Sequence, residues 1–317
     1  SLLTSTSPAA QAQRSTIGSG LAFGLTAYGL WGLFPLYFSL FDSVSPVQVV
    51  CYRIVWSLVF VLLLIAVTRG WAALRAGLRS RRVLGLLVIA AVAISVNWTT
   101  YVYSVQSNQV VEASLGYFIN PLLTVLLGVI ILGERLRGPQ WTAIGLAAIG
   151  VIVIGIGKGA APWIGLTLAT SFAVYGLVKK VAGAPALTSL AIETGVLFPV
   201  ALAFLAFTEA QSGLAVASGD WGLALLMVGL GPVTAIPLLA YAAAANRLPL
   251  SLLGITQYLT PSAILVLGII VFGDTVPPLE WVGFAIIWIG LAIFSVDALR
   301  RSRQPNEADV LEVAEPA

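Results

Sequence analysis

The stretch "EASLGYFINPLLTVLLGVIILGER", residues 112–135, combines a membrane-length apolar run with residues that interrupt it. Between its charged ends lie about twenty apolar residues, and a helix rising about 1.5 Å per residue crosses a bilayer at that length. Gly116, Asn120 and Pro121 fall inside the run. A proline removes a backbone donor and clashes with the carbonyl four residues earlier, so the stretch predicts a membrane helix broken near its middle.

The composition points to the same environment for the whole chain. Hydrophobic residues make up 59% of the 317 residues and charged residues 9%, whereas about a quarter of the residues of a soluble protein are charged. This favours a membrane protein without a soluble domain. Histidine is absent, so the usual metal ligand is missing and proton chemistry would fall to carboxylates. We expect neither a bound metal nor a cofactor.

Breaks at polar, glycine and proline clusters divide the chain into ten predicted membrane helices. Their approximate bounds are 18–41, 46–68, 83–105, 111–132, 140–157, 163–180, 187–208, 221–245, 250–272 and 278–298. An even number places both termini on one side of the membrane. The fold predicted on this basis is an all-α integral membrane protein.

The basic residues outside the spans fall almost entirely on the side of the termini. That side holds Arg14, Arg69, Arg75, Arg79, Arg81, Arg82, Arg135, Arg137, Lys179, Lys180, Arg247, Arg300, Arg301 and Arg303, and the opposite side holds Lys158. The positive-inside rule therefore predicts cytoplasmic termini. Because topology explains these charges, we expect no nucleic-acid partner.

The opening stretch recurs 140 residues later, as "LGITQYLTPSAILVLGIIVFGDT". The offset carries Pro121 to Pro261, Gly128 to Gly268 and Trp141 to Trp281. Five spans in each copy, an odd number, make the second copy run in the opposite sense. The chain is predicted to hold two inverted five-helix repeats around a central cavity, an architecture of secondary transporters. The predicted parts are a cytoplasmic tail (1–17), the repeats (18–158 and 159–299) and a disordered cytoplasmic tail (300–317).

The paired prolines, Pro121 and Pro261, are predicted to weaken the turns around Tyr117 and Gln257. Irregular backbone at mid-membrane should face protein or a watery cavity, since an unsatisfied polar group in hydrocarbon costs several kcal/mol. We interpret both breaks as lining a solute path. The alternative is that the prolines only help ordinary membrane helices to pack.

Two charged side chains, Arg53 and Glu193, lie clearly inside predicted spans. The 140-residue offset superposes them, and the inversion predicts that they lie on opposite sides of the midplane, Arg53 toward the outside. We assign both to gating or coupling, with Glu193 as the candidate proton carrier; the alternative is a structural ion pair or a snorkelling side chain. The expected partners are Asp42 or Glu112 for Arg53, and Lys179 or Lys180 for Glu193.

Aromatic and amide side chains gather in several of the spans. Tyrosine and tryptophan offer broad apolar surfaces with one hydrogen-bonding edge, which suits a site for small amphipathic molecules. The alternative for each is ordinary core packing. The candidate solute-binding residues are Tyr28, Trp31, Asn97, Trp98, Tyr101, Tyr117, Asn120, Tyr175, Tyr241, Gln257 and Tyr258.

Motifs for catalysis are missing from the sequence. The stretch "GVIVIGIGKGA" has the wrong spacing for a phosphate-binding loop, and no Ser or Thr follows its lysine. Paired acidic motifs for Mg²⁺ and nucleophile–histidine pairs are also absent. The single cysteine, Cys51, lies in an apolar run and is interpreted as a buried thiol. We expect a protein that is not an enzyme.

Several stretches resemble a known family: "AYGLWGLFPLYF", "YRIVWSLVF", "RLPLSLLGITQYLTP" and "FAIIWIGLAIFSVDAL", together with the opening stretch. They are similar to the EamA family of the drug/metabolite transporter superfamily, and to its RarD-type branch in particular, with YddG-type aromatic amino-acid exporters as relatives. The resemblance implies ten helices in two inverted repeats, a bacterial inner-membrane location and export of small metabolites or drugs. It implies no catalytic residues.

These observations together predict a secondary transporter, an exporter or facilitator working by alternating access. Its expected solutes are small amphipathic metabolites, foremost amino acids including aromatic ones, or drugs, and proton coupling is an option. A passive solute channel is the first alternative. A membrane-embedded enzyme acting on a lipid-linked substrate is the second. The oligomeric state is left open.

Overall fold

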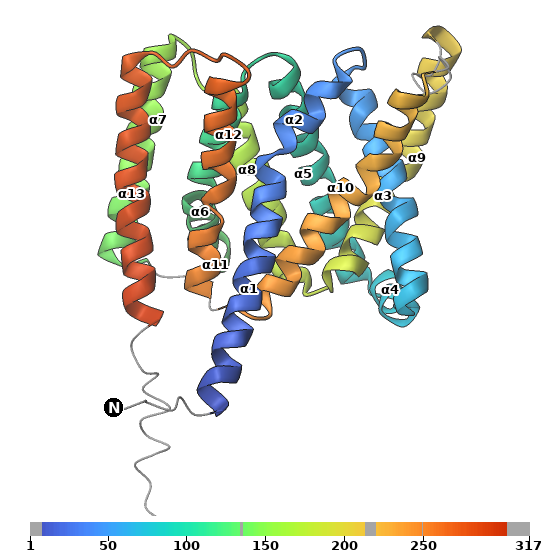
Figure 1. Cartoon of the computed structure of the whole chain (residues 1–317), viewed down its shortest axis with the longest axis horizontal. Helices are drawn as coiled ribbons and strands as arrows, with labels where there is room; N and C mark the ends of the chain where they lie inside the picture. The colour runs from blue at the N-terminus through green and yellow to red at the C-terminus, as the bar shows by residue number, and fades with distance from the viewer. Residues whose placement is uncertain (1–7, 134–135, 213–219, 249, 303–317) are drawn as a thin grey trace, which may run out of the picture.

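The computed structural model describes residues 8–133, 136–212, 220–248 and 250–302. Glu134, which the repeat pairs with Asp274, lies outside these ranges. So do Arg135 and residues 303–317 of the predicted disordered tail, whereas residues 300–302 of that tail belong to a helix. The helices of the described residues stand roughly parallel in one bundle, with the amino-terminal end of α1 at its lower side (Figure 1).

The described residues form thirteen α-helices and one 3₁₀ helix, and these ranges contain no strand. Ten helical segments in them are long and apolar enough to cross a membrane. The predicted all-α fold with ten membrane helices is therefore confirmed. The elements are α1 (Pro8–Gly32), α2 (Phe34–Phe38), η1 (Ser39–Phe41), α3 (Pro46–Thr68), α4 (Trp71–Arg79), α5 (Arg81–Gln106), α6 (Val110–Leu132), α7 (Gly138–Lys158), α8 (Trp163–Ala182), α9 (Ala186–Ser212), α10 (Trp221–Ala245), α11 (Leu250–Thr256), α12 (Leu259–Ile270) and α13 (Pro278–Ser302).

Local sequence signals set several of the helix ends. The Ser45 hydroxyl accepts a hydrogen bond from the Gln48 N–H, forming a capping box before α3. The Asp220 carboxylate likewise accepts from two backbone N–H groups at the start of α10. Gly133 and Gly159 end α6 and α7 with φ values of 68° and 70°, a conformation that glycine adopts without strain.

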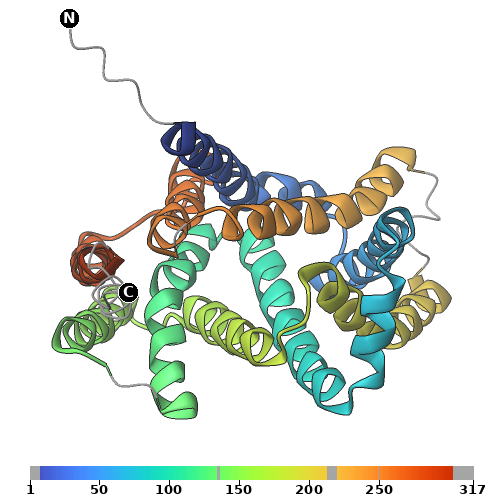
Figure 2. The same ribbon diagram turned by 90° about the horizontal axis from the view of Figure 1, so that it is seen from below.

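The helix pairing has the symmetry expected of an inverted repeat. Five extensively packed pairs are α3 with α9, α6 with α12, α7 with α13, α5 with α8 and α1 with α10. Exchanging the two halves maps the first three of these pairs onto themselves and exchanges the last two. Helices α6 and α8 also pack extensively, as do α3 and α10, and both pairs pack more extensively than their repeat counterparts, α1 with α12 and α5 with α9. The chain alternates direction from span to span, so related helices run oppositely (Figure 1). From below, α7 and α13 lie at one edge of the bundle and α3 and α9 at the other (Figure 2).

The contact between α7 and α13 repeats this symmetry at single residues. A Cβ atom on Gly150 would lie 2.7 Å from the carbonyl oxygen of Gly283. A Cβ atom on Gly290 would lie 3.0 Å from the carbonyl oxygen of Ala143. The 140-residue offset relates Gly150 to Gly290 and Ala143 to Gly283. The same close backbone approach, which small residues permit in membrane helices, therefore occurs twice.

The two proline-containing helices, α6 and α12, differ. The break predicted at Pro121 is wrong, since α6 continues through it. The break predicted in the ninth span is confirmed, because α11 ends at Thr256 and α12 begins at Leu259. The packing around the two helices also differs: a Cβ atom on Gly116 of α6 would lie 2.7 Å from a backbone oxygen of α8, whereas Gly254 of α11 has open space around it.

Two short helices were not expected. Helix α4 lies between α3 and α5 on the side of the basic loops (Figure 1). It buries Leu74 and leaves its arginines exposed, as an interfacial helix does. Helix α2 interrupts the first predicted span at Leu33, because Pro35 lacks the N–H that a continuous helix needs. Helix α2 itself buries Phe34 and Phe38 in the interior of the bundle.

Candidate functional site

Arg53 lies in the interior of the bundle, enclosed by aromatic rings. It extends from α3 and is 4% exposed. Its guanidinium carbon lies 3.9 Å from the ring centroid of Trp98, 5.4 Å from that of Phe38 and 5.6 Å from that of Phe34. We call these four residues the Arg53 cage. Helices α2, α3 and α5 build it, and the interruption of the first span supplies two of its rings.

One polar side chain orients the guanidinium of Arg53. Its Nε donates a hydrogen bond to the Thr234 hydroxyl oxygen on α10, at 2.9 Å. That hydroxyl donates in turn to the carbonyl oxygen of Leu230, at 2.8 Å. The hydroxyl proton is thereby committed to the carbonyl, so the hydroxyl oxygen is free to accept from Nε. Thr234 thus holds the arginine in place without supplying negative charge.

The acidic partner expected for Arg53 is not present. Arg53 takes part in none of the ion pairs found among the described residues, which include Arg137–Asp297, Lys158–Glu112 and Lys179–Glu193. Asp42 is exposed and Glu112 pairs with Lys158, so the prediction of either as partner is wrong. Removing an ion from water costs several kcal/mol. A cation–π contact returns about 2 kcal/mol when desolvated, so the positive charge of Arg53 stays poorly compensated.

Glu112 instead joins helix ends on the side away from the basic loops. Its carboxylate pairs with Lys158 and accepts a hydrogen bond from the Ile164 N–H at 2.8 Å. Nearby, the Asp274 carboxylate accepts from the Val111 N–H at 2.8 Å. Burial raises the pKa of the Asp274 carboxyl, and the Val111 hydrogen bond partly offsets that rise. These contacts close this end of the bundle around α6, α7 and α8.

Glu193, the repeat counterpart of Arg53, has a complete set of partners. It is 1% exposed on α9. Lys179 of α8 lies 3.1 Å from its carboxylate, as predicted. The Ser189 hydroxyl donates to the same carboxylate at 2.7 Å and the Tyr175 hydroxyl at 3.0 Å. The ammonium of Lys179 also donates to the Tyr175 hydroxyl oxygen, at 2.7 Å, so both charges are satisfied locally.

A continuous row of rings connects these two buried charges. Phe38 contacts Tyr101 with 5.9 Å between ring centroids, and Tyr101 contacts Tyr117 at 5.9 Å. Tyr117 contacts Phe172 at 6.2 Å, and Phe172 contacts Tyr175 at 5.8 Å. The hydroxyl of Tyr101 is buried without a hydrogen-bond partner among the described residues. The row therefore holds an unused polar group beside the Arg53 cage.

A second aromatic group lies between α1 and α10. Tyr28, Trp31 and Tyr241 contact one another with centroid separations of 5.6, 5.9 and 6.0 Å. The Thr260 hydroxyl of α12 donates to the carbonyl oxygen of Tyr28 at 2.8 Å. The repeat relates Tyr241 to Tyr101 of the first group, so the two groups occupy related places in the two halves.

The predicted amides link helices in this conformation. The Asn97 amide donates to the Leu168 carbonyl oxygen at 3.0 Å and to the Ser171 hydroxyl at 3.1 Å. The Asn120 amide donates to the Ala169 carbonyl oxygen at 3.2 Å. Both amides fasten their helices to α8. Gln257 lies half-buried in the turn between α11 and α12, next to Tyr258.

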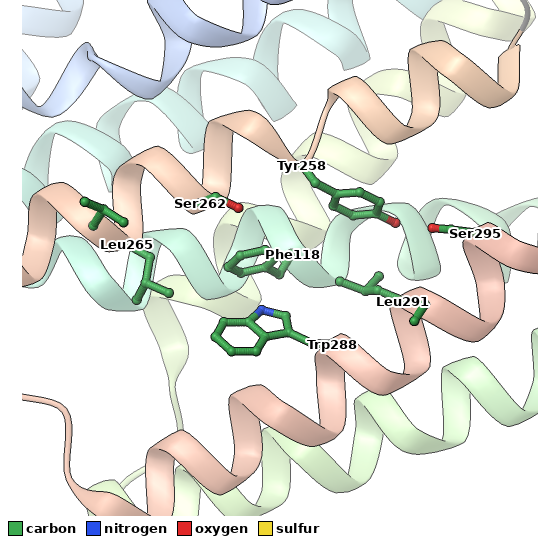
Figure 3. Close-up of a pocket in the computed structure, with 9 residues that line it drawn as sticks. Phe118, Tyr258, Ser262, Leu265, Trp288, Leu291 and Ser295 are labelled. Carbon is green, nitrogen blue, oxygen red and sulfur yellow. The ribbon is translucent and has the colours of Figure 1, made fainter.

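A pocket of about 470 Å³ opens on the side of the bundle between α6, α12 and α13 (Figure 3). Of the predicted solute-binding residues it contains Tyr258, whose hydroxyl faces that of Ser295. Sequence reasoning missed Phe118, although the repeat relates it to Tyr258. Val266 and Trp288 are 51% and 37% exposed, so the pocket faces outward. Its lining residues are Phe118, Tyr258, Ser262, Leu265, Val266, Trp288, Leu291, Ala292 and Ser295.

A multi-pass helical bundle with inverted repeats and polar groups between its halves is the architecture of a membrane transporter. The EamA-like transporter family matches residues 18–156 and again residues 160–296. The chain belongs to this family.

Named relatives agree with the assignment. The chain is 47% identical to "Protein RarD" of Streptomyces exfoliatus, over 94% of each chain. It is 39% identical to "Protein RarD" of Escherichia coli, over 91% of this chain and 97% of that one. A solved crystal structure with 20% identity matches the fold with a TM-score of 0.57, over 90% of this chain and 99% of the other. This last likeness concerns the fold alone.

Proposed function

We propose that this transporter is a secondary exporter or facilitator of small amphipathic metabolites, foremost amino acids including aromatic ones, or drugs. The observation that carries the proposal is the buried row of rings between Arg53 and Glu193. It is contributed by helices of both repeats and offers apolar faces together with polar edges. Such surfaces suit solutes that have an apolar body and a polar end.

In this proposal the row of rings binds the solute during alternating access, when the bundle opens to one side of the membrane at a time. Side chains of the row pack against one another here, so a solute enters only when helices separate. The turn between α11 and α12 is a place where a helix half can move without breaking regular hydrogen bonds. Pro261 maintains this turn because it cannot donate to the Gln257 carbonyl, which accepts from the Thr260 N–H at 3.3 Å. We assign gating to Pro261. Its repeat counterpart Pro121, the second candidate for gating, lies inside a continuous helix, so the hinge is assigned to Pro261 alone.

Residues 18–158 and 159–299 would be the two inverted halves that rock against each other. The basic loops orient the protein with both termini in the cytoplasm of a bacterium, in the inner membrane. Outward movement of solute then runs from the side of Glu193 to the side of Arg53.

A flux experiment tests the proposal directly. The purified full chain, reconstituted in liposomes, should exchange labelled amino acids across the membrane without ATP. Uptake should saturate with concentration and should be accelerated by unlabelled solute on the opposite side, which a passive channel would not show. Equal fluxes in protein-containing and empty vesicles over a panel of aromatic amino acids, aliphatic amino acids and neutral amphipathic drugs would overturn it.

Proton coupling through Glu193 has its own test. An inward or outward pH gradient should stimulate exchange by the wild type, and Glu193→Gln should abolish the stimulation while leaving exchange without a gradient. Stimulation that survives in the Glu193→Gln variant would remove Glu193 from the coupling step.

A further inference from the structure

The unused donors of Arg53 define a place for a negative charge. A guanidinium carries five N–H donors, and the one on Nε is taken by Thr234. Trp98 covers one face of the guanidinium at 3.9 Å. The N–H groups on the two Nη atoms therefore remain as the hydrogen-bond donors of this cation. In the described part of the chain no carboxylate forms an ion pair with it.

We propose that Arg53 is the binding residue for the carboxylate of the transported solute, and that the preferred solutes are amphipathic monocarboxylates. This inference rests on the proposed transport function and names its substrate class. The two Nη groups bind the two carboxylate oxygens side by side, as the planar guanidinium fork favours. The rings of Trp98, Phe38 and Phe34 then surround the apolar part of the solute.

The surroundings favour a carboxylate over a phosphate. A phosphate carries more negative charge and more acceptor oxygens, which a single arginine in an aromatic cage cannot satisfy. A carboxylate needs few donors, and the unpartnered hydroxyl of Tyr101, on the ring next to Phe38, can supply one more. The site thus matches one negative charge attached to an apolar body.

The comparison with Glu193 strengthens the assignment. Both residues are buried charges at related positions, but Glu193 is neutralised by Lys179. The electrostatic imbalance is therefore local to Arg53. A solute carboxylate would remove the imbalance in the loaded state, which makes binding of the anion favourable.

Competition binding to the full chain in detergent tests the charge requirement. Labelled L-phenylalanine is the probe, and the competitors are unlabelled L-phenylalanine, L-phenylalaninamide, 3-phenylpropionate and phenyl phosphate. We expect phenylpropionate to compete within about tenfold of phenylalanine, and the amide and the phosphate to be at least about 30-fold weaker. Equal competition by phenylalanine and its amide would overturn the proposal, as would tighter binding of the phosphate.

Variants of the cage identify the residue responsible. Arg53→Met should weaken phenylalanine binding about 100-fold, the loss expected when one partner of a buried charge pair is truncated. Arg53→Lys should keep part of it, about tenfold weaker, because a lysine retains the charge but not the fork. Thr234→Val removes the acceptor of Nε and should weaken binding about fivefold. Arg247→Met, at an exposed arginine outside the cage, is the matched control and should bind normally.

The flux panel separates failure of this inference from failure of transport itself. A wild type that carries neutral amphipathic drugs but not carboxylates would keep the transport function and overturn the role of Arg53. Carboxylate transport that is unchanged in folded Arg53→Met would do the same. A wild type that carries no solute of the panel would overturn the transport proposal and, with it, this inference.

Discussion

Arg53 and Glu193 occupy equivalent positions in the two repeats, yet their environments differ in kind. Glu193 accepts hydrogen bonds from Ser189 and Tyr175 and pairs with Lys179. Arg53 has aromatic rings and one hydroxyl oxygen. A duplicated fold therefore places a charge at the equivalent position of each half without giving it the same partners. The half whose buried charge lacks a partner of opposite charge is the half in which we expect the solute to bind.

The largest expected effect is the loss of stability on replacing Glu193, the buried charge that has a full set of partners. Glu193→Ala leaves the Lys179 ammonium buried without its carboxylate, and breaking a buried pair in this way costs about 3 to 5 kcal/mol. The free energy of unfolding in mixed micelles measures the loss. Asp42→Ala, at an exposed carboxylate, is the control and should change stability by less than about 0.5 kcal/mol.

A double variant sharpens this result. Glu193→Leu combined with Lys179→Met removes both charges together, so it should recover at least half of the stability lost in Glu193→Ala. A double variant that is no more stable than the single one would show that the loss in Glu193→Ala does not come from the unpaired Lys179 ammonium. In that case the contrast with Arg53 would disappear.

Replacing Arg53 should change the free energy of unfolding in the opposite direction. Arg53→Met removes a poorly compensated buried charge and keeps an apolar chain of similar length, so the free energy of unfolding should rise by about 1 to 3 kcal/mol. Arg247→Met is again the control, since Arg247 is exposed. A loss of stability greater than about 1 kcal/mol in Arg53→Met would mean that the arginine is a structural residue.

Much of the fold could be predicted because the bilayer imposes simple rules on the sequence. Apolar length locates the spans: it predicts 46–68, and Pro46–Thr68 is observed for α3. The 140-residue offset of the repeat predicts which helices of the two halves correspond to each other. Departures occur where local chemistry competes with hydropathy, as at Pro35, which divides the first span, and in α4, whose short amphipathic pattern resembles a polar loop.

The backbone also differs between the halves, since α6 is continuous and its counterpart is divided into α11 and α12, and a third prediction uses this difference. Pro261→Ala restores an N–H that can donate to the Gln257 carbonyl, so α11 and α12 should merge into one stiffer helix. The initial rate of labelled amino-acid exchange in liposomes should fall about fivefold, equivalent to about 1 kcal/mol in activation free energy. Pro121→Ala is the matched control and should change the rate less than twofold, because α6 is already continuous.

Equal losses of rate in the two proline variants would show that the break between α11 and α12 is not the moving element. A rate change must also be separated from a change in affinity. Binding of labelled phenylalanine to each variant in detergent makes that separation, and we expect it to stay within about twofold of the wild type.

For the candidate site, the sequence predicts which types of residue take part but not which residues contact one another. Hydropathy predicts that Arg53 and Glu193 lie inside membrane helices, but the partner of each depends on which helices meet. The prediction of Lys179 or Lys180 as the partner of Glu193 rests on the short connection between α8 and α9, and Lys179 is the residue that forms the ion pair. Asp42 and Glu112 are also near Arg53 in the span order, yet Glu112 reaches Lys158 and the start of α8 instead.

The smallest expected effect concerns Asn97, which precedes Trp98 of the cage but resembles Glu193 in being hydrogen-bonded within the protein. Asn97→Leu removes two interhelical hydrogen bonds between α5 and α8, and such bonds contribute about 0.6 kcal/mol each in membrane proteins. The free energy of unfolding should fall by about 1 kcal/mol while phenylalanine binding stays within about threefold. Asn120→Leu, which removes a single hydrogen bond of 3.2 Å, should lose about half as much. Asn97→Leu could instead keep its stability and bind phenylalanine more than about tenfold more weakly. The Asn97 amide would then belong to the solute site beside Trp98, and hydrogen bonding within the protein would no longer separate structural residues from solute-binding ones.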